Sequence, residues 1–518
     1  MNPKELHFDQ EGRDKLLDGI TSMSKAVKST LGPSGHTVMM ESPNHTKGMT
    51  ITKDGVTVAK NFDLEDPVAN LAVGLMKEAA DRTALSAGDG TTTAIVLTEA
   101  IIKNGMIFLE ENPHVNVHDL IKDIKTDSED AIKYLDKISK KVSGKTLESV
   151  ATISANNNKF LGKMIANAYR DLGKDGKLAV ENSKTEKTYC EITEGIKIDR
   201  GYSSKLFINN HRKDECILDD VLILVTDMEI NNILEIECIL KPIINQKKSL
   251  LIIGNCANNV TNTLAANVVQ NNLKLCNIIP PSFGYKTNEL LGDIALATGA
   301  TYFSESQGDN LGMLTMDNLG SADKIVVGKS ESTIVTGKQD SEDIVKRIEE
   351  LKEQRDMNSN KNERDFIDQR ISLLMGKVGV IYVGANSDIE QKEKYDRVDD
   401  AVCAVKSAME EGILPGGGVA LLRYADKMIG KRSDVLRKSF FSPFEQILVN
   451  AGKDPMTVVR NISDYVNKGY DVKNDKYGDM YKMGIIDPAK VTKNALKNAV
   501  SVATTILSTN AIMTMKRK

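Results

Sequence analysis

Both ends of the chain are predicted to be helical, whereas its middle alternates strands and helices, and this nested pattern constrains the fold more than any other feature. Near the N-terminal end, apolar residues recur every three or four positions from Val68 to Thr83, as on the buried stripe of a helix. From about 189 to 328, short β-rich runs alternate with helix-like segments, which is typical of an α/β unit. Helix dominates again from about 396 onwards. We therefore expect one helical domain built from both chain ends, with other domains inserted into it.

Local patterns add more detailed expectations to this layout. A β-hairpin-like passage is predicted between 37 and 59, with its last strand at 56–59. The charge-rich stretch from 341 to 375 is predicted to form an antiparallel helix pair, and a strand is predicted at 378–383. A second short hairpin is expected at 477–487.

Composition excludes several classes of protein. The chain has 518 residues, with 68 Lys and Arg against 72 Asp and Glu, which gives a formal net charge of −4. At roughly one domain per 150 residues, this length suggests about three domains. Nucleic-acid binding normally needs a strong basic excess or a basic face, and the near-balanced charge offers neither. We therefore expect no nucleic-acid partner.

The cysteines and the N-terminal sequence indicate a reducing, intracellular compartment. The six cysteines never come closer than 18 residues to one another, so no CxxC pair exists. The first 30 residues lack the apolar core of a secretory signal, and their acidic residues are atypical of a transit peptide. The longest apolar runs fall far short of the ~20 residues that a membrane span needs. These observations predict a soluble protein with no membrane partner.

Three glycine-centred turns are candidates for binding phosphate. They are Thr30-Leu31-Gly32-Pro33, Gly88-Asp89-Gly90-Thr91-Thr92-Thr93 and Gly416-Gly417-Gly418. Glycine lets backbone amides approach a phosphate, and a helix that starts just afterwards adds the positive end of its dipole. Asp89 is well placed to hold Mg²⁺, which prefers carboxylate and phosphate oxygens. None of the turns fits the P-loop or dinucleotide-binding pattern, and each of them could simply cap a helix.

Three aspartates are candidates for the chemistry that such a site would need. Phosphoryl transfer to water requires a metal ion and a group that orients the attacking water. Asp54, Asp89 and Asp400 could supply these roles if folding brings them together. Spacing alone does not single them out among 72 acidic residues. The residues by themselves therefore indicate a phosphate site outside the common classes and leave the reaction open.

Longer segments resemble group I chaperonins of the GroEL type. The likeness is carried by TLGPSGHTV at 30–38, ITKDGVTVAK at 51–60, SAGDGTTTAIV at 86–96, VDDAVCAVKSAMEEGILPGGGVALLR at 398–423 and YGDMYKMGIIDPAKV at 477–491. It covers essentially the whole chain in the family's order. The implied fold is multidomain α and α/β, with a mainly helical equatorial domain at 1–136 and 411–518. An α/β intermediate hinge domain would occupy 137–193 and 379–410, and an α/β apical domain would occupy 194–378.

The resemblance implies an ATP-hydrolysing site in the equatorial domain. Asp54 and Asp400 would be catalytic and would position the hydrolytic water, with Asp400 carried by the intermediate hinge, and Asp89 would hold Mg²⁺. The implied cofactors are ATP and Mg²⁺, with K⁺ as a further candidate cation. The matching nucleotide-binding positions are Thr30, Leu31, Gly32, Pro33, Lys53, Gly55, Gly88, Asp89, Gly90, Thr91, Thr92, Thr93, Gly417 and Asp487.

The resemblance also implies a machine that folds other proteins. The chain would assemble with itself into seven-membered rings, stacked in pairs, and a co-chaperonin lid of the GroES type would close the ring chamber. Unfolded client proteins would bind an apolar rim on the apical domain. The matching client-binding positions are Tyr202, Leu206, Phe207, Leu240, Leu264, Val268 and Val269. The implied location is the bacterial cytoplasm, with a processed organelle form as the alternative.

The sequence departs from the family pattern in the apical region. Glu237 occupies a rim position that is normally apolar, and the family's Gly-Phe-Gly turn reads Ser282-Phe283-Gly284. The ATP turns are intact. The leading prediction is therefore an ATP-dependent chaperone that assists folding inside a capped ring. The alternative is a divergent paralogue that acts as a nucleotide-regulated holdase or scaffold, with weakened client or lid binding.

Overall fold

The computed structural model describes most of the chain and divides it into two compact units. The described residues are 4–41, 49–172, 177–183, 185–211, 214–271, 273–282, 284–336, 342–358, 360–428, 434–462 and 467–515. Unit 1 comprises Met1–Arg170, Val180–Tyr189 and Tyr382–Lys518, and unit 2 comprises Asp171–Ala179 and Cys190–Ile381. One unit is thus built from both chain ends, with the other inserted between them. The further division of the end-built part into equatorial and intermediate domains stays a prediction.

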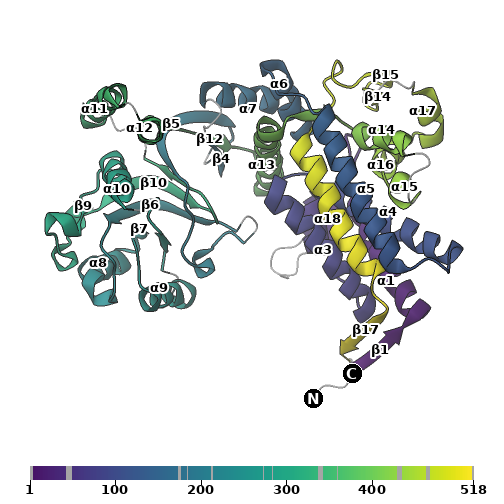
Figure 1. Cartoon of the computed structure of the whole chain (residues 1–518), viewed down its shortest axis with the longest axis horizontal. Coiled ribbons are helices and arrows are strands. Elements are labelled where there is room, and N and C mark those ends of the chain that lie inside the picture. Colours follow the sequence, from purple (N-terminus) through teal and green to yellow (C-terminus); the bar gives the residue numbers. More distant parts are fainter. Residues whose placement is uncertain are drawn as a thin grey trace. The chain divides into compact units, whose positions relative to one another are not determined.

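Unit 1 is organised around long helices from both ends of the chain. They are α1 (Asp9–Lys28), α3 (Pro67–Ala87), α4 (Thr91–Glu111), α5 (Val117–Ile138) and α18 (Ala489–Leu507). The C-terminal helix α18 packs against α3, α4 and α5, and Figure 1 shows it in yellow among the purple and blue helices of the N-terminal part. One continuous apolar core joins these helices, and fully buried members include Ile20, Met76, Ile101 and Leu496. The predicted apolar stripe of α3 faces this core.

The remaining elements of unit 1 are shorter. Two-stranded sheets pair β1 (Lys4–Phe8) with β17 (Ala511–Met515), β2 (Val38–Glu41) with β3 (Met49–Thr52), and β13 (Ile413–Pro415) with β16 (Ile486–Pro488). The helices are α2 (Gly55–Lys60), α6 (Gly144–Ser154), α7 (Lys159–Leu172), α13 (Asp388–Glu411), α14 (Val419–Lys427), α15 (Asp434–Ser439), α16 (Ser442–Asn450) and α17 (Pro455–Asn461). Of all the described helices, only α4 is long and apolar enough to cross a membrane, and half of that stretch is buried, which is a weak indication of a span.

Two local predictions in unit 1 are wrong. Residues 56–59 form helix α2 rather than a strand, because the Asp54 carboxylate caps that helix by accepting the backbone N–H groups of Val56 and Thr57. The C-terminal hairpin lies earlier than expected and joins β14 (Lys468–Asp471) to β15 (Lys476–Asp479). The Asp471 carboxylate closes the turn of this hairpin by accepting the backbone N–H groups of Lys473 and Asn474 at 3.0 and 3.2 Å.

Unit 2 is built on a mixed β-sheet. Its strands β6 (Cys216–Thr226), β7 (Ser249–Ile253) and β8 (Leu275–Ile278) are parallel, and β9 (Tyr302–Phe303) pairs with β6. On the other side of β6, antiparallel pairing continues through β10 (Gly320–Val327), β11 (Ser332–Val335) and β5 (Tyr189–Ile198). The sheet order is completed by β12 (Lys377–Val383) and β4 (Lys177–Asn182). The β-rich runs predicted for the middle of the chain therefore all form strands.

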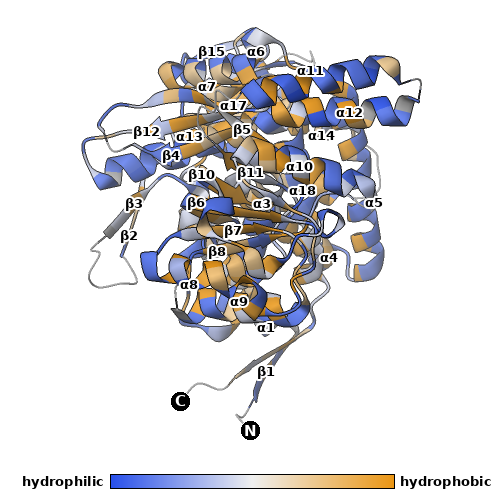
Figure 2. Cartoon of the chain, turned by 90° about the vertical axis from the view of Figure 1, so that its left-hand side faces the viewer, coloured by the Kyte–Doolittle hydropathy of each residue, from blue (hydrophilic) through white to orange (hydrophobic). Residues whose placement is uncertain are grey.

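Helices surround this sheet and complete the apolar core of unit 2. They are α8 (Glu237–Gln246), α9 (Asn258–Asn271), α10 (Tyr285–Thr298), α11 (Glu342–Met357) and α12 (Lys361–Leu374). Every residue of β7 and β8 is buried, and Figure 2 shows these strands largely in orange, the colour of hydrophobic residues. The helices α11 and α12 pack against each other as the predicted pair. Arg370 on α12 ties this pair to α10 by donating from Nε to the Asp293 carboxylate at 2.5 Å.

Candidate nucleotide site

A single cavity in unit 1 collects the residues that the sequence singled out for nucleotide chemistry. Its volume is about 990 Å³, which is at the upper end of the usual range for small-molecule pockets. Segments from residue 30 to residue 492 contribute to its walls, so folding brings together positions that are far apart in the sequence. The predicted residues that line it are Thr30, Leu31, Gly32, Pro33, Lys53, Asp54, Gly55, Gly88, Asp89, Gly90, Thr91, Thr92, Thr93, Asp400, Gly417 and Asp487.

The Gly88–Gly90 turn ends one long helix and begins the next. Gly88 closes α3 with φ +72°, and Gly90 precedes α4 with φ +86°, so both glycines adopt the left-handed region that residues with a Cβ avoid. The first residues of α4 are Thr91, Thr92 and Thr93, and all three line the cavity. The first turn of a helix leaves backbone N–H groups without helical partners, and these groups and the helix dipole attract anions. The turn can therefore cradle phosphate groups.

We predict that adding a single methyl group at Gly88 will destabilise unit 1. A Cβ atom there would lie 2.3 Å from the Cys403 Cβ and 2.6 Å from its Sγ, and the positive φ adds strain. Gly88→Ala should therefore lower the free energy of unfolding by about 2–4 kcal/mol, measured by chemical denaturation. Gly74→Ala is the matched control, because Gly74 lies on the exposed side of the same helix, and a Cβ atom added there would meet no neighbouring group within 4 Å. The control should gain up to about 1 kcal/mol, and equal losses in both variants would contradict the prediction.

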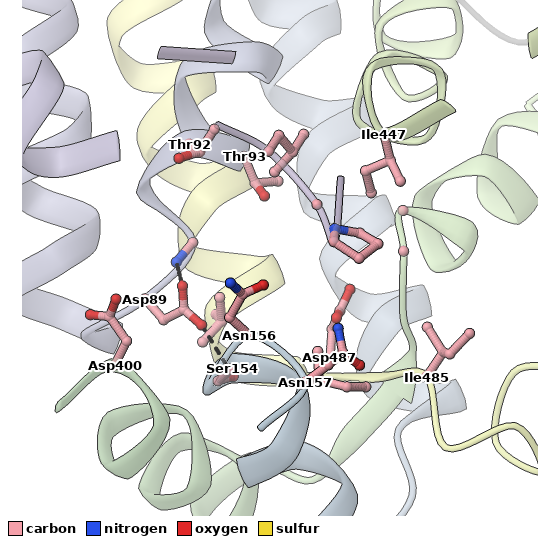
Figure 3. A pocket seen from close by; sticks show the side chains of 18 of the residues that line it. Asp89, Thr92, Thr93, Ser154, Asn156, Asn157, Asp400, Ile447, Ile485 and Asp487 are labelled. Atoms are coloured by element: carbon pink, nitrogen blue, oxygen red, sulfur yellow. Dashed lines mark hydrogen bonds between the residues drawn. The ribbon is translucent and has the colours of Figure 1, made fainter. Parts of the chain in front are cut away.

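Asp89 lies in the turn between the two helices, with its carboxylate facing the α6–α7 connection. Its Oδ1 accepts the Gly90 backbone N–H at 2.5 Å, and its Oδ2 accepts the Ser154 hydroxyl at 3.5 Å (Figure 3). Burial, and then the nearby charge of Asp54, raise the pKa of Asp89 above its ordinary value. A divalent cation would relieve both effects by neutralising the carboxylates.

The carboxylate arrangement fits Mg²⁺ better than a metal held by protein ligands alone. Among the described residues, no group of three or more His, Cys, Asp or Glu side chains could hold a metal ion. Mg²⁺ is commonly bound through one or two carboxylates, with phosphate oxygens and waters completing its shell. Asp89, with Asp54 close enough to shift its pKa, supplies a donor set of that kind.

Asp54 and Asp400 approach the cavity from different elements. The Asp54 carboxylate is oriented by its capping role, because it accepts the Val56 and Thr57 N–H groups at 3.0 Å and the Thr57 hydroxyl at 2.6 Å. Asp400 lies on α13, and Figure 3 shows its side chain pointing toward the same space as Asp89. The Ser407 hydroxyl, two turns further along α13, donates to the Ala87 carbonyl at 3.1 Å and ties α13 to the end of α3. Asp54 and Asp400 thus both line the cavity to which the Gly88–Gly90 turn contributes.

The opposite part of the cavity is formed by the glycine-rich turn at 416–418 and by β16. Asp487 lies on β16, opposite Leu414 of β13. Burial, and then the charge of Asp89, raise the pKa of Asp487 to about 6, although the Gly417 and Gly418 N–H groups donate to its carboxylate and oppose that rise. Apolar side chains line the cavity as well, and those labelled in Figure 3 are Ile447 and Ile485. This part could accept an uncharged ring system and a sugar.

The helices α6 and α7 and their connection contribute lining residues that the sequence did not single out. Ser154 donates to Asp89, and Asn156 and Asn157 have positive φ values of 54° and 61° at the cavity wall. Two basic residues, Lys145 and Lys159, also line the cavity. Asparagine tolerates the left-handed region better than other non-glycine residues, so the run of three asparagines at 156–158 is a weak signal for such a turn.

The predicted client-binding positions have very different exposures in unit 2. Leu206 and Val269 are exposed by 53% and 61%, whereas Tyr202 and Val268 are half-buried. Phe207, Leu240 and Leu264 are at most 6% exposed and belong to the apolar core. Leu234 and Ile244, which were not predicted, are exposed by 64% and 53%. The assignment of all seven positions to client binding stays a prediction, and the exposed side chains are the ones that a client could reach directly.

The departures from the family pattern are only partly described. Glu237 opens α8 and forms an i,i+4 ion pair with Lys241 at 2.9 Å, so its charge is balanced within its own helix. An exposed pair of this kind contributes little to stability. Phe283 lies outside the described residues, while Ser282 and Gly284 on either side of it both have positive φ.

Comparison with known proteins identifies the family. The model of the TCP-1/cpn60 chaperonin family matches residues 23–517. The chain belongs to this family. A relative, chaperonin GroEL 3 of Psychromonas ingrahamii, is 39% identical over 525 residues, which cover 99% of this chain and 96% of the relative. Membership confirms the predicted role of a chaperone in protein folding.

Solved chaperonin structures show the same fold. Crystal form II of chaperonin gp146 from bacteriophage EL 2 (Pseudomonas aeruginosa), in the presence of ATP-BeFx, matches with a TM-score of 0.68 at 22% identity. Crystal form I matches with a TM-score of 0.63 at 21% identity, and both matches cover 99% of each chain. The predicted GroEL-like multidomain fold with α and α/β parts is therefore confirmed for this chaperonin.

Proposed function

We propose that this chaperonin is a Mg²⁺-dependent ATPase that uses ATP hydrolysis to fold client proteins. The observation that supports the proposal is the cavity of unit 1, which is lined by the Gly88–Gly90 turn, by the carboxylates of Asp54 and Asp400, and in part by apolar side chains. The triphosphate would lie against the start of α4 and the Gly88–Gly90 turn. The adenosine would lie toward Gly417 and Asp487.

The chain's own residues would divide the work of hydrolysis between them. Backbone N–H groups at the start of α4 would hold phosphate oxygens in place. Asp89 would hold Mg²⁺, which would neutralise charge on the phosphates. Asp400 and Asp54 would orient the attacking water and accept its proton, and Asp54 is already fixed by the N–H groups of α2. Lys53, next to Asp54 at the cavity wall, would add positive charge near the phosphates. K⁺ is a further candidate cation at this site.

Clients would bind an apolar apical surface on unit 2, which we define by Leu206, Leu234, Ile244 and Val269. All four side chains are more than half exposed. Non-native proteins expose apolar groups, and burial of such groups is favourable by about 25 cal/mol per Å² without regard to sequence. The surface would hold clients until they move into a chamber formed by the ring.

The family resemblance supports a proposal for the assembly and the location. We propose seven-membered rings of this chain, stacked in pairs and closed by a co-chaperonin of the GroES type, in the bacterial cytoplasm. The equatorial, intermediate and apical domains at the predicted boundaries would be the moving parts of each subunit.

The second candidate function is a nucleotide-regulated holdase or scaffold. Glu237, with its partner Lys241, places a polar pair on the same helix as Ile244 of the apical surface. A polar pair there would weaken apolar binding of clients or of a lid, while the nucleotide cavity keeps all of its predicted residues.

The test measures mass, ATP hydrolysis and refolding on one preparation. Light scattering should give a particle of about seven or fourteen times the 56.8 kDa chain, and hydrolysis should stop when EDTA removes Mg²⁺. A denatured client should regain activity only with ATP, and faster with a GroES-type lid. A monomer under every condition would contradict the ring. Hydrolysis without release of active client would favour the holdase.

A further inference from the structure

The turn at 30–33 is held from behind by a single amide side chain. Asn450, the last residue of α16, donates from Nδ2 to the backbone carbonyls of Lys28 and Leu31, at 2.8 Å in each case. Its Oδ1 accepts the Gln446 side-chain amide at 2.7 Å, one helical turn earlier. Asn450 thus bridges two segments that lie more than 400 residues apart in the sequence.

The geometry places this bridge on the far side of the turn from the cavity. Leu31 and Gly32 line the cavity, as do Ile447 and Leu448 of α16, whereas Asn450 and Gln446 are not among the lining residues. Gly32 has φ +83°, and a Cβ atom on it would lie 3.2 Å from the Ile447 side chain. The turn therefore rests directly on α16, and Asn450 engages its carbonyls behind the surface that a nucleotide would meet.

We propose that Asn450 is a positioning residue for nucleotide binding, which it supports by keeping the Lys28 and Leu31 carbonyl oxygens away from the phosphates. This inference rests on the proposed ATP site. A carbonyl oxygen that turned into the cavity would repel an anion, while the amide side chain gives both carbonyls a donor elsewhere. The two carbonyls fix which way the Asn450 amide faces, because they can only accept, and Gln446 holds that orientation by donating to the Asn450 oxygen.

The sharpest test replaces Asn450 with its isostere. Asn450→Asp keeps the shape of the side chain but replaces the NH₂ group with a carboxylate oxygen. That oxygen can only accept, and it would face the Lys28 and Leu31 carbonyl oxygens. We expect the KM for MgATP to rise by about 10- to 100-fold, while kcat at saturating MgATP stays within about twofold of the wild type. The matched control is Asn104→Asp on α4, because the Asn104 Nδ2 donates to the Ser439 hydroxyl at 3.0 Å in the same unit, outside the cavity lining. The control should lose stability without a change in KM.

The outcomes separate this inference from the proposed function. Failure of the wild type to bind or hydrolyse MgATP would overturn the proposed function itself. Hydrolysis by the wild type together with an unchanged KM in folded Asn450→Asp would overturn only the positioning role. A fall in kcat at constant KM would also overturn it, because loss of folded protein alone produces that pattern. If Asn450→Asp does not fold, Gln446→Leu should raise the KM by a few-fold, and an unchanged KM there would count against the inference.

Discussion

Replacing Asp400 with Asn should leave MgATP binding nearly unchanged and reduce turnover by about 100- to 10,000-fold, the usual contribution of a positioned general base. Asp400 reaches the cavity from α13, apart from the turns that would hold the phosphates. Loss of its negative charge removes the group that would accept the proton from the attacking water, but it removes no predicted contact with the nucleotide. The measurement is a steady-state assay for turnover together with calorimetric titration of the affinity for MgATP.

The neighbouring residue supplies the control for this variant. Asp399→Asn makes the same chemical change on the same helix, and Asp399 is not among the residues that line the cavity. Its turnover should stay within about threefold of the wild type. Normal turnover in Asp400→Asn, or equal losses in both variants, would remove Asp400 from the catalytic role and leave Asp54 as the remaining candidate.

The second large effect is expected at Asp89. In Asp89→Asn the side chain keeps its size and can still accept the Ser154 hydroxyl, but it loses the charge that would hold Mg²⁺. We expect the affinity for MgATP to fall by at least about 100-fold, while the smaller affinity for ATP in EDTA changes little. Asp66→Asn is the control, because Asp66 caps the other end of α3, Asn caps helices equally well, and Asp66 lies outside the cavity lining. Equal MgATP affinity in the wild type and Asp89→Asn would contradict the metal assignment.

The raised pKa of Asp89 predicts how the wild type responds to acid. Burial and the Asp54 charge favour the protonated form, so a proton competes with Mg²⁺ at a higher pH than it would on an exposed carboxylate. Lowering the pH should therefore weaken the Mg²⁺-dependent part of ATP binding, and Asp89→Asn, which has no such proton, should lose this dependence.

Much of the architecture could be predicted from local patterns. Helical periodicity located α3, and the apolar runs of β6, β7 and β8 located the central sheet of unit 2, because burial on one face or on both produces a recognisable pattern of apolar residues. The helices of the C-terminal part, α18 among them, were predicted only as a region in which helix dominates. The same logic failed at α2, where Val56 and Val58 look like strand residues. At α2 the Asp54 carboxylate starts a helix by accepting the N–H groups of Val56 and Thr57 and the Thr57 hydroxyl. A pattern of apolar residues does not reveal such a cap.

The site was predictable only in part. The glycine turns and Asp89 stand out because glycines there precede helix starts, whereas the family resemblance was needed to single out Asp54 and Asp400 among the acidic residues and to add Asp487. Nothing in the sequence pointed to Asn450, whose partners are backbone carbonyls more than 400 residues away. Nor could periodicity distinguish Leu206 from Phe207, which are adjacent in sequence but 53% and 1% exposed. Tertiary packing decides such cases.

The insertion of one unit within another sets the order in which a ribosome can complete this protein. The main segment of unit 2, Cys190–Ile381, is continuous and can fold as soon as it emerges. The N-terminal helices are made earlier but must wait for α18, whose residues 489–507 cover their apolar faces. The cavity of unit 1 takes residues from 30 to 492, so it can close only after residue 492 has been made. We therefore expect this chaperonin to expose apolar helix faces of its own until α18 has been made, and such a partly made chain would resemble the clients that the finished one would receive.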